Sequence, residues 1–351
     1  MNEKFYDSEI HGIDWAGYRE TYAKFLPHID NNFDFQEMLS ELLGELNGSH
    51  TGARYSYRSG LTIGTLGAFY DYDYDGDGLK IKEVVKGGTL YIQDPEIKAG
   101  DIIMAIDGQK IEAGIDYYPM LAGKAGKATR LGIKGEKKEV VVRPISWGRQ
   151  EELLYKRWVR RNEHMVDSLS GGRIAYVHIE AMNAASFHEF YKNLLSEKNR
   201  MRDAVIVDTR HNGGGWLHND VCIALSGKAY SRYTPRGKFI GNDPFDRWVK
   251  PSCMLVCEDN YSNAHGTPWL YKEMGIGKLI GAPVPGTMTA VWWENIGQYT
   301  FGIPQVGTRD NRDNYLENQQ LNPDIECYVT PENMLRGVDT QIETAVKEMM
   351  K

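Results

Sequence analysis

The stretch Ala204-Val-Ile-Val-Asp-Thr-Arg-His-Asn-Gly-Gly-Gly-Trp216 decides the fold of this chain. Its first four residues are apolar and predict a short buried strand. The residues from Asp208 onward therefore lie at the carboxyl end of that strand, where α/β folds place their sites. Three consecutive glycines let the backbone adopt positive φ and approach a ligand closely, which suits an oxyanion hole or an anion cradle. A plain turn explains the glycines alone equally well. No lysine follows them in the phosphate-loop spacing, so nucleotide binding is disfavoured.

Strand-like and helix-like segments alternate around this stretch. The expected strands are 173–179, 204–208 and 254–257, and the expected helices are 150–167, 184–197, 217–226 and 264–274. Such alternation indicates an α/β domain with a largely parallel sheet.

The first 150 residues show a different pattern of apolar residues. Apolar residues recur at helical intervals from Trp15 to Leu46, whereas residues 55–144 form short strand-like runs separated by glycine turns. We therefore predict an α/β protein, α+β overall, in three parts: an N-terminal helical segment (1–57), an inserted β-rich domain (58–147) and the α/β domain (148–351).

The acidic run Asp71-Tyr-Asp-Tyr-Asp-Gly-Asp-Gly-Leu79 superficially resembles a calcium loop. The twelfth residue of such a loop is a bidentate carboxylate, but here it is Lys82 or Val84, depending on the starting residue. A hairpin turn is the better interpretation.

Composition excludes several classes of protein. With 351 residues, 41% of them hydrophobic, we expect a soluble globular chain of two or three domains. A net charge of -7 argues against a nucleic-acid partner, and the apolar runs are too short to cross a membrane. The N-terminus lacks the layout of a signal peptide, so the compartment stays open between the cytoplasm and, if a leader was removed, the periplasm.

The four cysteines of the chain are sparse. They lack metal-ligand spacing, and on one strand Cys253 and Cys257 would be roughly 13 Å apart, too far to form a disulfide. We expect buried free thiols and no metal site.

Ser262 is the candidate nucleophile. In Leu255-Val-Cys-Glu-Asp-Asn-Tyr-Ser-Asn-Ala-His-Gly266 it stands where a strand breaks into a helix, whose N-terminal amides would face developing negative charge. His50, in the loop Gly44-Glu-Leu-Asn-Gly-Ser-His-Thr-Gly52, is the natural general base for it. An acid should orient the imidazole, and Glu317 is one candidate among 48 acidic residues.

Five motifs occur in the order seen in tricorn-type serine peptidases, which belong with the tail-specific, carboxy-terminal processing proteases. They are 44–50, 208–215, Ser262 before a helix, 281–286 and 317–324. The chain thus resembles the catalytic core of that family over nearly its whole length. The resemblance implies a serine peptidase acting on peptides or unfolded proteins without a cofactor, and a PDZ-like domain at 58–147. Relatives form closed oligomers, so a homo-oligomer is compatible with it. Larger members carry upstream β-propellers, which leaves open whether this chain is part of a longer protein.

The resemblance also assigns roles to residues. It makes Ser262 the nucleophile and His50 the base, with Ser49 and Glu317 orienting the imidazole. The oxyanion hole would be formed by the amides of Gly213, Gly214 and Asn263. Relatives that use a serine–lysine dyad have lysine where Thr287 aligns, so here His50 becomes indispensable.

Five points depart from the family pattern or stay open. Asn263 stands where an acidic residue is usual, and a shifted register would put Ala264 in the position of the nucleophile. His265, within three residues of Ser262, could line the cleft, but a histidine at the start of a helix is more often exposed or capping, which is our expectation. The PDZ-like domain would bind a peptide carboxylate near Arg58-Ser-Gly-Leu-Thr-Ile-Gly64 or act only as a lid. The alternative function is a catalytically silent peptide-binding module.

Overall fold

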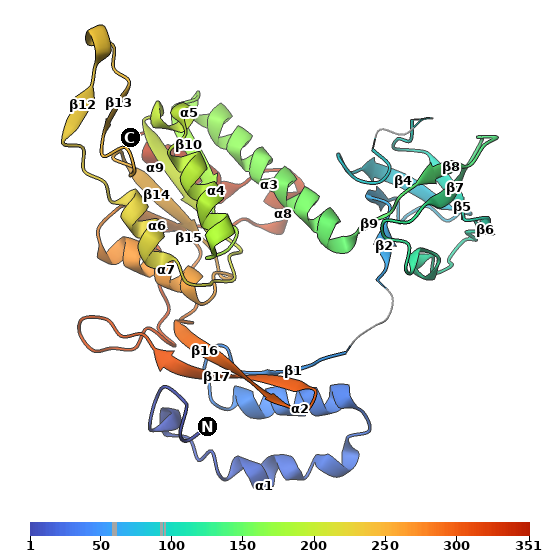
Figure 1. The fold of residues 1–351 in the computed structure, drawn as a ribbon, viewed down its shortest axis with the longest axis horizontal. Coiled ribbons are helices and arrows are strands. Elements are labelled where there is room, and N and C mark those ends of the chain that lie inside the picture. The colour runs from blue at the N-terminus through green and yellow to red at the C-terminus, as the bar shows by residue number, and fades with distance from the viewer. Residues whose placement is uncertain (58–61, 92–93, 95) are drawn as a thin grey trace. The chain divides into compact units, whose positions relative to one another are not determined.

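The computed structural model describes residues 1–57, 62–91, 94 and 96–351. They form two compact units, one of residues 1–56 with 162–351 and the other of residues 57–161. The long helix α3 (Trp147–Ser170) contributes residues to both units (Figure 1). Within the described part of the chain, every helix is too short or too polar to span a bilayer.

A five-stranded parallel sheet forms the centre of the first unit. Its order is β10 (Ile174–His178), β11 (Ala204–Asp208), β14 (Ser252–Val256), β15 (Lys278–Gly281) and β18 (Ile325–Glu326). All residues of β11 and β14 are buried, as expected for parallel strands covered on both faces. The predicted α/β domain with a largely parallel sheet is confirmed.

Helices cover both faces of this sheet. One core joins Val207 of β11 and Val256 of β14 to buried residues of three helices, α4 (Ala184–Leu194), α6 (His218–Leu225) and α7 (Asn263–Glu273). On the other face α9 (Thr340–Met349) lies against β11, β14 and β15. Two short helices, α5 (Glu197–Arg200) and α8 (Pro331–Leu335), also belong to this unit. Because these helices cover the two faces of the sheet, its carboxyl edge is left for the loops that follow each strand.

The N-terminal segment pairs with the C-terminal half of the chain in an antiparallel sheet of order β1-β17-β16. The strands are β1 (Ala53–Tyr55), β16 (Thr289–Ile296) and β17 (Tyr299–Gly307). Before them come η1 (Ile10–Gly12), α1 (Tyr18–Ala23), η2 (Leu26–His28) and α2 (Asn32–Gly44), as the helical periodicity predicts. Asn31 caps α2 by accepting from the amides of Phe33 and Asp34.

A separate arm leaves the parallel-sheet layers in Figure 1. It consists of β12 (Ser231–Tyr233), η4 (Pro235–Gly237) and β13 (Gly241–Asp243), and β12 and β13 pair in antiparallel fashion.

The second unit is rich in β structure, as predicted. Its main antiparallel sheet has the order β3-β4-β5-β7-β8, with β6 paired to β5, and a second pair joins β2 and β9. The elements are β2 (Gly64–Thr65), β3 (Ala68–Tyr70), β4 (Leu79–Val84), β5 (Ile102–Ile106), β6 (Gln109–Lys110), η3 (Tyr118–Leu121), β7 (Thr129–Ile133), β8 (Val140–Val142) and β9 (Ile145–Ser146). The acidic run 71–78 connects β3 and β4, which confirms the hairpin interpretation. Residues 58–61 of the expected carboxylate-binding loop lie outside the described residues.

Candidate active site

Ser262 occupies the turn between β14 and α7. Its backbone has φ 56° and ψ -125°, a conformation that non-glycine residues rarely adopt and that is held only where surrounding contacts enforce it. Ala264, the alternative nucleophile position, is fully buried, and its amide bonds to the Tyr261 carbonyl. The side chain that the turn displays is therefore that of Ser262.

Asn260 is one of the contacts that enforce this turn. Its buried side-chain oxygen accepts from the Cys257 amide at 2.9 Å, and its nitrogen donates to the carbonyl oxygens of Thr209 and Ala264 at 3.0 and 3.1 Å. The Ala264 carbonyl would otherwise lack its helical donor, because Pro268 has no amide hydrogen. Asn260 thus satisfies the helix interrupted by proline and links the nucleophile loop to the glycine-rich loop.

Gly214 approaches Ser262 closely. It has φ +98°, and a methyl group on it would stand 2.6 Å from the Ser262 Cβ and 2.7 Å from the Tyr261 carbonyl oxygen. Only glycine fits there, both in conformation and in space. By contrast, a methyl group on Gly213 would meet no atom within 4 Å.

The three predicted oxyanion-hole amides are not equivalent. The Gly214 amide donates to the Asn212 side chain at 2.8 Å. For the amides of Gly213 and Asn263, and for the Ser262 hydroxyl, no hydrogen-bond partner is found among the described residues. Ser262 and Asn263 stand at the N-terminus of α7, where the helix dipole favours negative charge, and Gly214, the neighbour of Gly213, lies against them.

The Asn263 side chain holds the start of α6 through hydrogen bonds. Its oxygen accepts from the amides of Leu217 and His218 at 2.7 and 2.9 Å, at the start of α6. Its nitrogen lies 2.8 Å from the His218 Nδ1. With these contacts the side chain, which is 1% exposed, fixes the segment after the glycines.

His50 stands in a buried polar cluster with Ser49 and Glu317. The His50 Nδ1 lies 2.9 Å from the Ser49 Oγ, and that hydroxyl donates to the Glu317 carboxylate at 3.0 Å. Glu317 also accepts from the Ser49 amide and is only 3% exposed. Thr289, at the start of β16, completes the cluster: its hydroxyl is 2.8 Å from the Ser49 Oγ and 3.1 Å from the His50 Nδ1.

Burial moves two pKa values in this cluster. It raises the pKa of Glu317, although the bonds from Ser49 oppose the change, and it lowers the pKa of His50. If the Ser49 hydroxyl donates to Glu317, it is left to accept from the His50 Nδ1–H. That arrangement assigns the neutral imidazole a free lone pair on Nε2.

Tyr261 connects the nucleophile turn to this cluster, and Thr287 holds the Ser262 backbone. The His50 amide donates to the Tyr261 phenol oxygen at 2.6 Å, and the two rings pack with centroids 4.9 Å apart. The Ser262 amide donates to the Thr287 hydroxyl at 2.9 Å. Among the described residues, no hydrogen bond joins the Ser262 hydroxyl to His50 itself.

His265 differs from the expectation of an exposed or capping residue, because it is buried with 1% exposure. Its Nδ1 accepts from the Thr287 amide at 3.3 Å, and burial lowers its pKa to about 4. The α7 helix enters the core at its first turn, which explains the difference. The residue lies at a cavity of about 270 Å³ that Trp269, Asp310 and Tyr315 also line.

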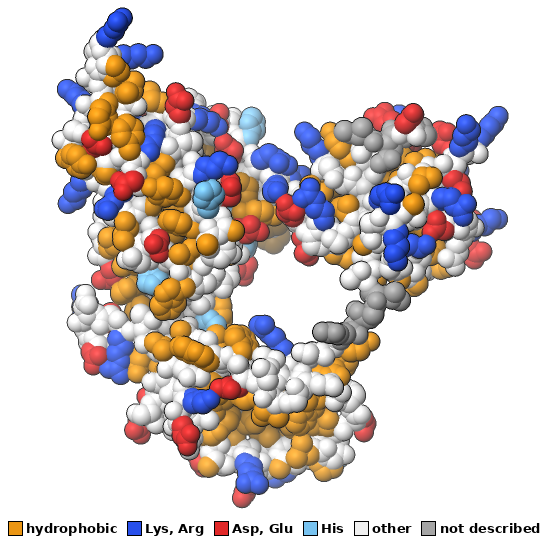
Figure 2. All heavy atoms as spheres, in the orientation of Figure 1, with side chains coloured by type: hydrophobic (Ala, Val, Ile, Leu, Met, Phe, Trp, Pro, Cys, Tyr) orange, Lys and Arg blue, Asp and Glu red, His pale blue; other side chains and the backbone are white. Residues whose placement is uncertain are grey.

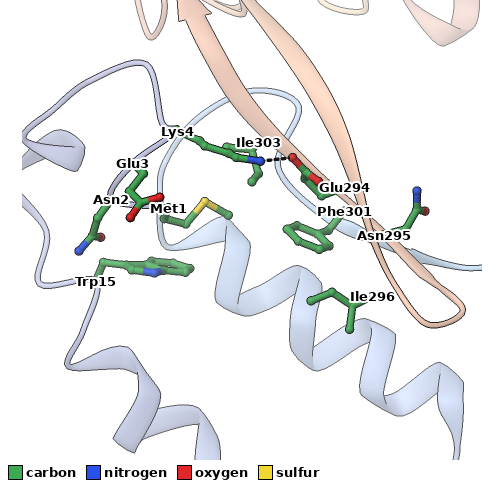
Figure 3. Close-up of a pocket in the computed structure, with 10 residues that line it drawn as sticks. All are labelled: Met1, Asn2, Glu3, Lys4, Trp15, Glu294, Asn295, Ile296, Phe301 and Ile303. Carbon is green, nitrogen blue, oxygen red and sulfur yellow. Dashed lines mark hydrogen bonds and ion pairs between the residues drawn. The ribbon is translucent and has the colours of Figure 1, made fainter.

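A second cavity, of about 530 Å³, lies between the N-terminal segment and the β16–β17 hairpin (Figure 3). Trp15, Phe301 and Ile303 supply apolar walls, and Lys4 pairs with Glu294 at its edge. None of the predicted site residues lines it.

Tyr261, Thr289 and Asn260 contribute to the site although no motif predicts them. Tyr261 and Asn260 stand within two residues of Ser262, which is a usable signal. Thr289 had none, because a threonine at the start of a strand is ordinary. All four cysteines are free, three of them buried and Cys327 partly so, as expected.

Three family models match the chain in succession. Residues 1–44 match the tricorn protease C1 domain, 64–146 the tricorn protease PDZ domain, and 173–327 peptidase family S41.

Curated relatives agree with these matches. A putative tricorn-like protease C-terminal subunit of Sulfurisphaera tokodaii is 28% identical over 96% of this chain and 40% of its own length. Tricorn protease homolog 1 of Streptomyces coelicolor is 27% identical over 99% of this chain and 34% of its own. The chain thus spans about a third to two-fifths of the length of these relatives.

The solved crystal structure of the tricorn protease has the same fold. It matches 99% of this chain and 35% of its own, with a TM-score of 0.82 and 23% identity. Fold and motifs together define a protein of the serine-peptidase class with an inserted PDZ domain. Residues 173–327 match peptidase family S41 and residues 1–44 and 64–146 match tricorn protease domains, so the chain resembles a tricorn-type member of that family.

Proposed function

We propose that this chain is a serine peptidase that hydrolyses peptide bonds through an acyl-enzyme on Ser262. The observation that carries the proposal is the hydrogen-bonded series from the partly buried His50 through the buried Ser49 to the buried Glu317. It leaves the outer nitrogen of His50 as a proton acceptor close to the turn that displays Ser262.

In the proposed reaction His50 removes the Ser262 hydroxyl proton as the oxygen attacks the substrate carbonyl. The imidazolium then donates that proton to the leaving amine, and water releases the acyl group by the reverse path. Glu317, acting through Ser49, stabilises the imidazolium. The Ser262–His50 bond would form when substrate binds, as catalytic hydrogen bonds often tighten only in the complex.

The geometry refines the proposed oxyanion hole. We assign the two donors to the amides of Gly213 and Asn263, because the Gly214 amide already serves Asn212. Gly214 would instead contribute space next to Ser262. The resemblance aligns Thr287 with the lysine of the serine–lysine relatives, and its hydroxyl accepts from the Ser262 amide. A threonine cannot act as a base there, so His50 would be the sole base.

The proposed substrates are peptides or unfolded proteins. We keep the three parts 1–57, 58–147 and 148–351 as our proposal for the division of labour, in which the PDZ-like part binds or gates peptide. We also propose a homo-oligomer, which is supported by exposed apolar side chains on the projecting arm, namely Tyr230, Tyr233, Phe239, Ile240 and Phe245. Figure 2 shows hydrophobic side chains gathered over that arm.

Labelling with a fluorophosphonate tests the proposal directly. We expect one equivalent of label on Ser262, none in Ser262→Ala, and a loss of at least about 100-fold in labelling rate in His50→Ala. Both variants should keep the parent's circular dichroism and its peptide affinity. An unlabelled parent chain that still binds peptide would instead favour the silent peptide-binding module.

A further inference from the structure

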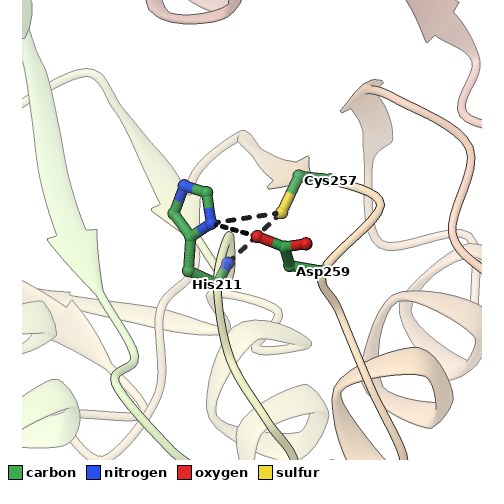
Figure 4. Close-up of side chains that lie close together, drawn as sticks. All are labelled: His211, Cys257 and Asp259. Carbon is green, nitrogen blue, oxygen red and sulfur yellow. Dashed lines mark hydrogen bonds and ion pairs between the residues drawn. The ribbon is translucent and has the colours of Figure 1, made fainter.

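Three potential metal ligands meet beside the proposed catalytic site (Figure 4). His211 comes from the loop after β11, whereas Cys257 and Asp259 come from the loop after β14. Their ligand atoms all lie within 4.8 Å of one another. The His211 Nδ1 is 2.8 Å from the Asp259 Oδ2 and 4.0 Å from the Cys257 Sγ. Imidazole, thiolate and carboxylate together form a ligand set that zinc prefers.

We propose that His211, Cys257 and Asp259 form a zinc-binding site that cross-links these two loops. In a tetrahedral zinc site the nitrogen and sulfur ligands stand about 3.5 Å apart, and the nitrogen and oxygen ligands about 3.3 Å. The observed separations of 4.0 and 2.8 Å bracket these values. The Asp259 oxygen and the Cys257 sulfur lie within 4.8 Å of each other, so this pair would have to close by about one ångström to share an ion. The fourth position is left for water.

The surrounding structure holds the ligands ready. Asn260 bonds to the Cys257 amide and to the Thr209 carbonyl, so one buried side chain already bridges the two loops. The His211 amide also donates to the Cys257 Sγ at 3.2 Å. His211 and Asp259 are exposed on one side, which gives an ion access from solvent. Zinc would replace an exposed His–Asp ion pair that contributes little to stability by itself.

The ligands of the proposed zinc site stand close in the sequence to residues of the proposed catalytic site. His211 stands two residues before Gly213, and Asp259 three residues before Ser262. An ion bound by both loops would fix the spacing between the glycine-rich loop and the nucleophile turn. Because zinc would bind only when these loops are in place, it should also stabilise the folded chain. This inference does not depend on the proposed peptidase activity.

Metal titration of the full chain without a polyhistidine tag tests the proposal. We expect one equivalent of Zn²⁺ by calorimetry and a rise in Tm on addition of zinc. Co²⁺ should give a thiolate-to-metal charge-transfer band that zinc displaces. Cys257→Ser should abolish the band, and His211→Asn and Asp259→Asn should weaken zinc binding about 100-fold. Asparagine suits position 211 because it tolerates the φ of 62° found there.

Matched controls make the result decisive. Cys327→Ser removes a thiol elsewhere, and His188→Asn removes an exposed imidazole on α4, so both should bind zinc like the parent. Binding that survives in Cys257→Ser, or no stoichiometric binding by the parent chain, overturns the proposal. Equal weakening in the control variants, which would reveal non-specific binding, also overturns it.

Discussion

The backbone amide of His50 donates a 2.6 Å hydrogen bond to the phenol oxygen of Tyr261, the residue directly before Ser262. The bond joins segments that lie 211 residues apart in the sequence. It fixes the position of the proposed base relative to the proposed nucleophile, and it uses the main chain of His50, so the imidazole stays available for chemistry. The contact that positions the proposed base and the proposed nucleophile therefore does not use the atoms that would react.

Tyr261→Phe should therefore slow catalysis more than it destabilises the fold. The ring contact with His50 remains, and the freed amide is near solvent, so we expect a loss of about 1 kcal/mol in the free energy of unfolding. We expect kcat to fall about tenfold, because the His50 loop is less well fixed. Steady-state kinetics and urea unfolding measure the two effects. Tyr328→Phe is the control, and an unchanged kcat would argue against a positioning role for Tyr261.

Alanine substitution should reduce activity strongly at Gly214 and hardly at all at its neighbour Gly213. Gly214→Ala places a methyl group against Ser262 and forces an unfavourable φ, so we expect a loss of about 100-fold or more in kcat/KM. Gly213→Ala keeps its amide and meets open space, so activity should stay within about threefold of the parent. Similar losses in both variants would contradict the division of roles between these residues.

Glu317→Gln tests the orienting acid. The amide is of similar size but neutral, so it cannot stabilise an imidazolium through Ser49. We expect kcat to fall roughly 100- to 1,000-fold with little change in KM. Glu332→Gln, at an exposed position in α8, should behave like the parent. A variant of Glu317 that raises KM without changing kcat would place this residue in substrate binding instead.

Activity should persist below the pH expected for an ordinary histidine base. Burial lowers the pKa of His50 from 6.5, and the reaction needs the neutral imidazole. The acid limb of log kcat/KM against pH should therefore bend below pH 6.5. A bend above that pH, measured with a substrate that does not titrate, would show that another group controls the limb.

Stability should depend on His265 in mildly acidic solution. The folded chain holds this histidine with a pKa of about 4, against 6.5 when it is unfolded, so between these values the unfolded state binds the extra proton. Stability is fully present above pH 6.5 and is lost as the pH falls to about 4, by up to roughly 3 kcal/mol. His265→Asn should flatten this dependence in denaturant unfolding at pH 7 and pH 4. Parallel curves for the parent and the variant would exclude the effect.

The sequence predicted the parallel sheet because 204–208 and 252–256 are buried on both faces, which leaves a strong apolar pattern. The candidate site was predicted only where a motif carried it. His50 and Glu317 are 267 positions apart, and nothing local in the chain brings them together. Hydrogen bonds from side chains to main-chain atoms could not be predicted from the sequence for the same reason. Asn260 and Tyr261 act through contacts that exist only in the folded chain. The burial of His265 was mispredicted because the start of a helix is usually exposed.

The pairing of β1 with β17 has a consequence for the order of events during synthesis. Gly302 lies against the His50 carbonyl, where any side chain would collide with it, so the base loop settles only when β17 exists. A chain emerging from the ribosome carries Ser49 and His50 first, whereas Thr289, β17 and Glu317 follow much later in the sequence. A growing polypeptide that already contains His50 and Ser262 would thus be unable to cut its neighbours or itself until β17 and Glu317 have been made.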